Sequence, residues 1–265
     1  REKAASRFDL LKCQTDCKSL YLQGTLLNAE TAELTLSKGG LTLVRKLYSA
    51  SEFASGVALE NLPVELWQPN GLGKASLYDL QINGQHYRVG FREVNWTQCL
   101  NAPENADPWI CEVNGKKICL QGINWTPIRP NYADVQEQDY RKRLLAYRDM
   151  GMNLIRVWGG ATREKDCFYD LCDELGIMVW QEFPLSSSGI ENLPPSDESA
   201  MVEIMTVADY YLRTLVHHPS LIVWCGGNEL QRGLDGRDSG CGKPCTVEEP
   251  LLGRLAELVK QRDPS

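Results

Sequence analysis

The sequence has few histidines, no long apolar run and no cluster of basic residues, and each shortage argues against a class of protein. Three histidines and ten cysteines with no paired C-x-x-C spacing do not form a zinc-binding pattern, so we expect no metal. No apolar stretch approaches the roughly 20 residues of a membrane span, and no signal-peptide core follows the first residues. The net charge of −7, with scattered Lys and Arg, argues against a nucleic-acid partner.

An ordinary globular composition remains. With 43% hydrophobic and 24% charged residues, a chain of 265 residues can bury one large core or two smaller ones. Cys13 with Cys17, and Cys241 with Cys245, lie in loop-like sequence where each pair could close a small disulfide. The redox compartment therefore stays open, with the periplasm or secretion as candidate locations. We expect no cofactor, and a homo-oligomer is left open.

Residues 1–108 carry a β pattern. Short alternating apolar runs are separated by a Gly-Gly pair at residues 39–40, and the Asn-Gly pair at residues 83–84 is typical of a tight hairpin. No helix of convincing periodicity occurs there, and a connector containing Pro and Asn follows at residues 101–108. These features predict a β-sandwich domain over residues 1–108.

Beyond residue 108, strand patterns alternate with helix patterns, which is typical of a parallel sheet with helical crossovers. We expect four strands, at residues 118–122, 153–158, 177–180 and 221–225, with helices near residues 137–150, 168–175, 201–215 and 247–261. Eight such units close a barrel, so residues 109–265 are predicted to form the N-terminal half of a TIM-barrel domain. The alternative is a complete four-stranded sheet, which would expose an apolar edge.

Polar and aromatic side chains gather where the predicted strands end, which is where barrels of this kind place their reactive groups. They are Asn124 after the first strand, Arg156 and Trp158 after the second, Trp180 and Glu182 at the third, and Trp224, Asn228 and Glu229 at the fourth. Aromatic faces stack on the C–H surfaces of sugars, while charged and amide groups hold sugar hydroxyls. The strand ends therefore indicate a carbohydrate ligand.

Several ordered motifs resemble glycoside hydrolase family 2, in particular its β-mannosidase branch: residues 122–127, 156–160, 168–183, 218–220 and 228–229. Residues 66–71, 77–80 and 88–92 also resemble the immunoglobulin-like module of that family. The resemblance covers most of the chain beyond about residue 60. It implies an immunoglobulin-like β-sandwich followed by the first half of a TIM (β/α)8 barrel, with a β-linked carbohydrate as substrate.

The resemblance also implies that Glu229 is the general acid/base of a retaining exo-β-glycosidase, with Asn228 on the sugar 2-hydroxyl. A retaining enzyme protonates the departing oxygen with one carboxylic acid while a second carboxylate, about 5 Å away, attacks the anomeric carbon. Glu229 needs a raised pKa for this role, from partial burial beside Trp224 or from the negative charge of the second carboxylate. The family's nucleophile belongs to the seventh strand, so we expect it outside these residues and expect the segment alone to be inactive.

The other strand-end residues have a structural interpretation beside the functional one. Arg156 should neutralise a carboxylate, either the missing nucleophile or Glu182. Trp158 and Trp180 either form walls of the sugar site or belong to the core. Glu182 is a wall residue under the resemblance, but it is the candidate nucleophile if the four-unit sheet is complete. Asn124 either contacts substrate or belongs to an N-glycosylation sequon.

The identity of the sugar stays open, because the loop at residues 186–192 departs from the aromatic-rich segment expected in β-mannosidases. The alternatives are a β-galactosidase, a β-glucuronidase and an exo-glucosaminidase. A non-catalytic carbohydrate-binding or scaffold domain of the same fold is an alternative from a different functional class.

Overall fold

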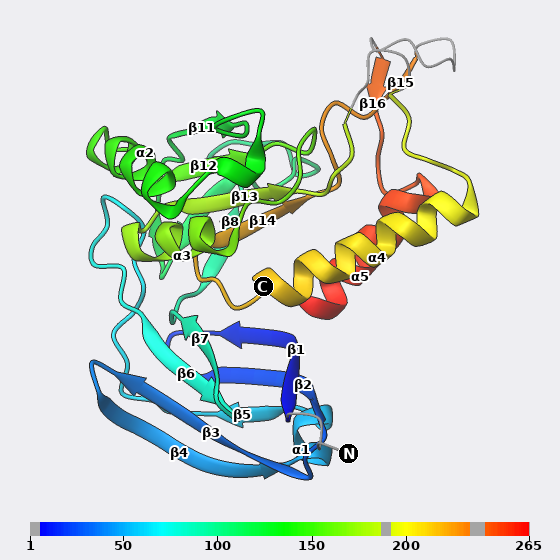
Figure 1. Ribbon diagram of the computed structural model, residues 1–265. Coiled ribbons are helices and arrows are strands. Elements are labelled where there is room, and N and C mark those ends of the chain that lie inside the picture. The colour runs from blue at the N-terminus through cyan, green and yellow to red at the C-terminus, as the bar shows by residue number, and fades with distance from the viewer. Residues whose placement is uncertain (1–5, 187–191, 234–241, 265) are drawn as a thin grey trace.

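The computed structural model describes residues 6–186, 192–233 and 242–264, which form a β-rich half and an α/β half (Figure 1). The β-rich half consists of β1 (Arg7–Thr15), β2 (Leu20–Leu27), β3 (Thr31–Lys38), β4 (Leu41–Ser49), α1 (Ala50–Ser55), β5 (Val57–Leu59), β6 (Tyr78–Ile82) and β7 (Gln85–Val89). Three further strands follow: β8 (Val94–Thr97), β9 (Ile110–Val113) and β10 (Lys116–Lys117). The α/β half consists of β11 (Gly122–Trp125), the 3-10 helix η1 (Tyr132–Asp134), α2 (Glu137–Asp149), β12 (Leu154–Val157), α3 (Asp166–Leu175), β13 (Met178–Glu182), α4 (Glu198–Leu215), β14 (Leu221–Cys225), β15 (Gln231–Gly233), β16 (Gly242–Pro244) and α5 (Pro250–Arg262). None of the described helices is long and apolar enough to cross a bilayer.

Two antiparallel sheets of the β-rich half pack around one core. Their strand orders are β1-β2-β5 and β4-β3-β6-β7, and every second residue of β2 is buried because successive side chains of a strand point to opposite faces. Phe53 of α1 is fully buried and contacts Phe8, with 4.9 Å between the ring centroids. We expected no helix here; α1 corrects that, since six residues capped by Ser49 are too few to show a helical period.

The predicted turns of this half are confirmed. Asn83 and Gly84 join β6 to β7 with φ values of 51° and 79°, as a tight hairpin turn requires. Gly39 and Gly40 join β3 to β4 in the same left-handed region. Cys13 and Cys17 do not form the disulfide considered above. Cys241 lies outside the described residues.

The α/β half contains the predicted parallel sheet, with strand order β11-β12-β13-β14. Helices α2 and α3 cover one face, where Tyr140, Leu144 and Phe168 are fully buried. The fourth strand coincides with the predicted range, but the first does not. Residues 118–121 precede β11 instead, because Ile118 and Leu120 pack with the core beneath the sheet.

That second core lies between the parallel sheet and the small sheet β10-β9-β8. Its fully buried members are Trp67, Cys111, Val113 and Met178. Strands β8 and β9 pair with each other from Val94 opposite Val113 to Thr97 opposite Ile110. The connector at residues 101–108 is therefore the loop of a hairpin, and the predicted domain boundary falls inside that hairpin.

Buried hydrogen bonds join the two halves. The Trp67 indole Nε1 donates to the backbone oxygen of Asp173 at 2.9 Å, and Asn70 N donates to Gly176 O at 2.7 Å. A side chain at Gly176 would collide with the backbone of Asn70, and its φ of +68° favours glycine as well. Arg92, almost fully buried, donates at 2.6 Å to backbone oxygens on either side of the start of β14. The β-rich half thus fixes the strand that leads to Glu229.

Candidate active site at the ends of the parallel strands

The four parallel strands bring four of the predicted site residues together. Arg156 at the end of β12 donates from Nη1 to Asn124 Oδ1 at 3.0 Å and from Nη2 to Asn228 Oδ1 at 2.8 Å. It also contacts Glu182 at the end of β13. The carboxyl ends of parallel strands meet at one edge, which explains why residues 104 positions apart, Asn124 and Asn228, share one guanidinium.

Arg156 and Glu182 form a buried ion pair. Glu182 Oε1 lies 2.6 Å from Nη2 and 2.9 Å from Nε of Arg156, and its Oε2 accepts a hydrogen bond from Gly159 N at 2.7 Å. The Glu182 side chain is only 1% exposed, so its charge needs these partners. Of the two carboxylates considered for Arg156, Glu182 is the one the structure shows. Both oxygens of Glu182 are therefore occupied by internal contacts.

Asn228 is fixed by contacts on its backbone and on its side chain. Its N donates to Leu185 O at 2.8 Å, and its Nδ2 donates to Ser186 Oγ at 3.1 Å. Gly227 makes the approach possible, since an added Cβ there would lie 2.7 Å from Leu185 O, and its φ is +153°. Ser186 was not among the predicted site residues, because it belongs to a serine run between predicted elements.

Glu229 follows Asn228 with its side chain exposed. Its φ of +52° is in the left-handed region, which is uncommon for a residue other than glycine and is found mainly where the surrounding structure imposes it. The expected burial beside Trp224 is not found. Trp224 instead stacks on Phe183, with 5.4 Å between ring centroids, and donates to Asp263 Oδ2 at 2.8 Å.

The other two tryptophans of the predicted site differ in their surroundings. Trp180 stacks on Trp109 at 6.5 Å with 12° between the ring planes, and Trp109 contacts Trp96 edge-on at 5.8 Å. Trp180 is thus part of an aromatic row that begins in the β8–β9 hairpin. Trp158 is half-buried, and its ring covers Gly160, where an added Cβ would overlap it.

A polar network supports β13 from the helical side of the sheet. Tyr169 OH of α3 donates to Gln181 Oε1 at 2.6 Å, and Gln181 Nε2 donates to Glu182 O at 2.8 Å. Burial of Tyr169 raises its pKa well above the usual value, so the phenol stays protonated as a donor. The strand end that carries Glu182 is therefore held on both faces.

A pocket of about 670 Å³ opens beside Glu229, between the end of β14 and helix α5. Most of its lining is apolar, including Leu252, Leu255 and Val259 of α5. Cys225 also lines it, and burial raises the pKa of the Cys225 thiol. The pocket places an apolar surface next to Glu229, the exposed carboxylate that follows the fourth parallel strand.

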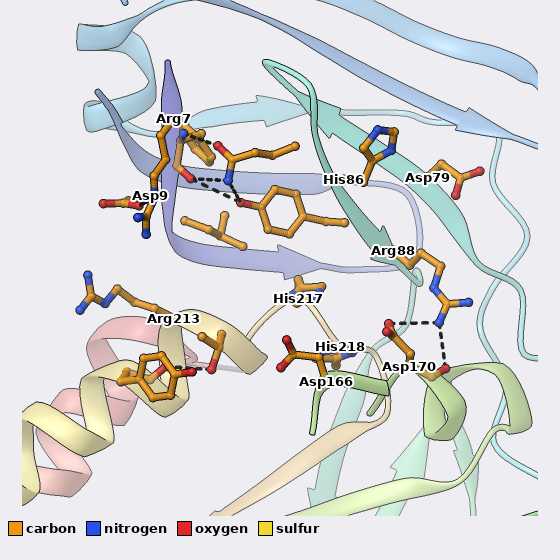
Figure 2. A pocket seen from close by; sticks show the side chains of 16 residues that line it. Arg7, Asp9, Asp79, His86, Arg88, Asp166, Asp170, Arg213, His217 and His218 are labelled. Atoms are coloured by element: carbon orange, nitrogen blue, oxygen red, sulfur yellow. Dashed lines mark hydrogen bonds and ion pairs between the residues drawn. The ribbon is translucent and has the colours of Figure 1, made fainter. Parts of the chain in front are cut away.

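A second cavity, of about 680 Å³, lies between the β-rich half and helices α3 and α4, away from the strand ends (Figure 2). Charged side chains of both signs line it, and Arg88 reaches across to Asp170 at 3.1 Å and to Glu174 at 2.6 Å. Asp170, Asp173 and His218 have the spacing of a metal site. However, His218 Nδ1 and Asp173 Oδ2 are already hydrogen-bonded at 2.6 Å, and Asp170 pairs with Arg88. Of these contacts, the Arg88–Asp170 pair joins the two halves.

Parts of known proteins resemble this chain in sequence and fold. Residues 109–245 match the model of the family described as glycosyl hydrolases family 2, TIM barrel domain. The β-mannosidase of Capra hircus is 36% identical over 183 residues, which are 64% of this chain and 20% of that protein. The β-mannosidase B of Aspergillus clavatus is 34% identical over 212 residues, or 76% of this chain and 24% of that protein. The chain thus spans about a fifth to a quarter of the curated relatives it matches.

Solved structures show the same fold. The β-D-mannosidase of Dictyoglomus thermophilum superposes with a TM-score of 0.76 at 25% identity, covering 97% of this chain and 34% of that one. The β-glucuronidase 3 of Bacteroides uniformis superposes with a TM-score of 0.71 at 22% identity, covering 98% of this chain and 32% of that one. Because the family model matches residues 109–245, which are more than half of the chain, the chain belongs to glycosyl hydrolase family 2.

Proposed function

We propose that this chain belongs to a retaining exo-β-glycosidase. In this proposal an immunoglobulin-like β-sandwich, assigned to residues 1–108, precedes the first half of a TIM barrel, assigned to residues 109–265, and the β8–β9 hairpin crosses the boundary between them. The strand order β11-β12-β13-β14 supports this proposal, because β14 has no further strand beside it among the described residues. The aligned residues are only 20% and 24% of the relatives named above, so those proteins are much longer than this chain. β-Mannosides are the first substrate to test, since several relatives bear the name β-mannosidase.

Glu229 is proposed as the general acid/base of this enzyme. The observation that carries the proposal is its left-handed backbone, which presents an exposed carboxylate at the end of β14, beside an Asn228 whose side chain is already fixed. Such backbone conformations concentrate at functional sites. Glu229 would protonate the departing glycosidic oxygen and then activate water.

The second carboxylate is proposed to lie outside these residues. Glu182, the other carboxylate at a strand end, uses both oxygens to hold Arg156 and the Gly159 amide. An attacking carboxylate needs an oxygen free to bond the anomeric carbon. Glu182 therefore fits a site wall, with Asn124, Trp158 and Trp180 as the neighbouring wall residues, and Asn228 contacts the 2-hydroxyl.

Turnover of 4-nitrophenyl β-glycosides by the natural-length protein tests this function. We expect the highest kcat/KM with the β-mannoside among mannoside, galactoside, glucuronide and glucosaminide, and a first-formed product that keeps the β configuration in proton NMR. The 265-residue chain alone should be inactive. Sugar binding without turnover of any substrate would instead favour a non-catalytic carbohydrate-binding protein, and an inverted product would contradict the retaining mechanism.

A further inference from the structure

The Asn228 amide is held from both sides by residues of neighbouring strand ends. Its Oδ1 accepts from Arg156 Nη2 at 2.8 Å, and its Nδ2 donates to Ser186 Oγ at 3.1 Å. A guanidinium has donors only, so the amide oxygen must face Arg156 and the amide nitrogen must face Ser186. The orientation of the amide is thus determined without a ligand.

The backbone places Ser186 for this contact. Leu185 O accepts the hydrogen bond from Asn228 N at 2.8 Å, and Ser186 and Asn228 form a parallel β-bridge. The loop that leaves β13 and the loop that leaves β14 are therefore joined at these residues. The Ser186 hydroxyl lies beside Asn228 because of this pairing.

Hydrogen bonds are what can fix an asparagine amide, because its terminal torsion is soft. Of the two hydrogens on Nδ2, one is donated to Ser186, and the other has no acceptor within the part of the chain that the structure describes. Asn228 is only 7% exposed and directly precedes Glu229. The second N–H of Asn228 Nδ2 therefore has a fixed direction and lies beside Glu229, the proposed acid/base.

We propose that Ser186 is a positioning residue that sets recognition at C2 of the sugar: it fixes the Asn228 amide so that the remaining N–H meets the 2-hydroxyl. This inference rests on the proposed function, in which Asn228 contacts that hydroxyl. Ser186 begins the loop whose sequence departs from the β-mannosidase pattern. Recognition at C2 then depends on a residue outside the family motifs.

Kinetics of the natural-length protein with a 2-deoxy substrate test the inference. Ser186→Ala should lower kcat/KM for 4-nitrophenyl β-mannoside about tenfold, the usual effect of one hydrogen bond, and leave that for the 2-deoxy glycoside within about twofold. Ser186→Thr, which keeps the hydroxyl, should restore the loss. Ser199→Ala, at the exposed start of α4, is the matched control and should change neither substrate.

The Ser186 variants test this inference, whereas turnover by the wild-type protein tests the proposed function. The two can therefore fail separately. An equal loss on both substrates, or no loss on the mannoside, would overturn the role of Ser186 while leaving the glycosidase intact. Crystal structures provide a test that needs no turnover. In Ser186→Ala, Asn228 Oδ1 should still face Arg156, but the Asn228 side-chain torsions should change because Nδ2 has lost its acceptor. An unchanged Asn228 rotamer with its Arg156 hydrogen bond intact would also overturn the inference.

Discussion

The β-rich half and the α/β half use their sheets in different ways. In the β-rich half two sheets face each other across an apolar core, which continues into α4 and α5. In the α/β half, α2 and α3 cover one face, the small β8–β10 sheet covers part of the other, and the strand ends carry charged and amide groups. The β-rich half therefore contributes mainly a packed core, and the α/β half contributes the polar groups of the candidate site. Trp67 and Arg92 join the two halves.

The largest stability effect is expected where the halves meet. Trp67→Ala should lower the free energy of unfolding by about 4 kcal/mol, since the indole is fully buried and its N–H bonds to Asp173 O. Urea denaturation of wild type and variant measures this loss. Trp109→Ala is the matched control, because that indole is 58% exposed, and it should cost far less. Equal losses of unfolding free energy in the two variants would mean that the contact between the halves matters no more for stability than an exposed tryptophan.

The buried ion pair should give the next largest effect. Arg156→Met leaves the 1% exposed Glu182 without its cation, which should cost about 3 kcal/mol in the same denaturation experiment. The double variant Arg156→Met, Glu182→Gln should recover part of that loss. Arg148→Met breaks an exposed pair with Asp149 and should cost about 0.5 kcal/mol or less. If Arg156→Met cost as little stability as Arg148→Met, Glu182 would not depend on Arg156 for its place in the fold.

A smaller effect should appear in the pH dependence of stability. Burial, followed by the nearby His218 and arginine charges, lowers the pKa of His217 well below its ordinary value. Below about pH 6.5 the unfolded chain therefore binds a proton that the folded protein does not, so stability falls as pH decreases through that range. Thermal unfolding between pH 7 and pH 5 measures this.

The matched control for the pH experiment is the exposed His86, which also lines the cavity between the halves. His217→Gln should flatten the decline in stability, whereas His86→Gln should leave it unchanged. A decline of the same size in His217→Gln would mean that groups other than His217 cause the loss of stability at acid pH.

Much of the fold was predictable because local patterns determine it. The apolar run at residues 221–225 predicts the strand β14, and the Asn-Gly pair at residues 83–84 predicts the hairpin that joins β6 to β7. The first parallel strand begins later than predicted, because the sequence pattern of apolar residues such as Ile118 is the same whether they pack within the parallel sheet or beneath it. The periodicity of apolar residues indicates which side chains are buried, but it does not indicate which element they pack against.

The candidate site was predictable in its members and not in its contacts. Position after each strand identified Asn124, Arg156, Glu182 and Asn228, and the structure brings these four together. The choice of Glu182 as the partner of Arg156 depended on distances in space. Ser186 was missed, because a serine in a loop has no pattern until β13 and β14 bring its hydroxyl to Asn228.

The role of Glu229 is the central claim, and the dependence of the Glu229→Ala rate on the leaving group tests it most directly. In the natural-length protein, this variant should lose about a thousandfold in kcat/KM for a 4-methylphenyl β-mannoside, whose leaving group needs protonation. It should lose far less in the glycosylation step with the 2,4-dinitrophenyl mannoside, and added azide should restore turnover and give the β-mannosyl azide. Glu257→Ala, an exposed carboxylate on α5, should change neither rate. An equal loss with both leaving groups and no azide product would contradict the assignment of Glu229 as the acid/base.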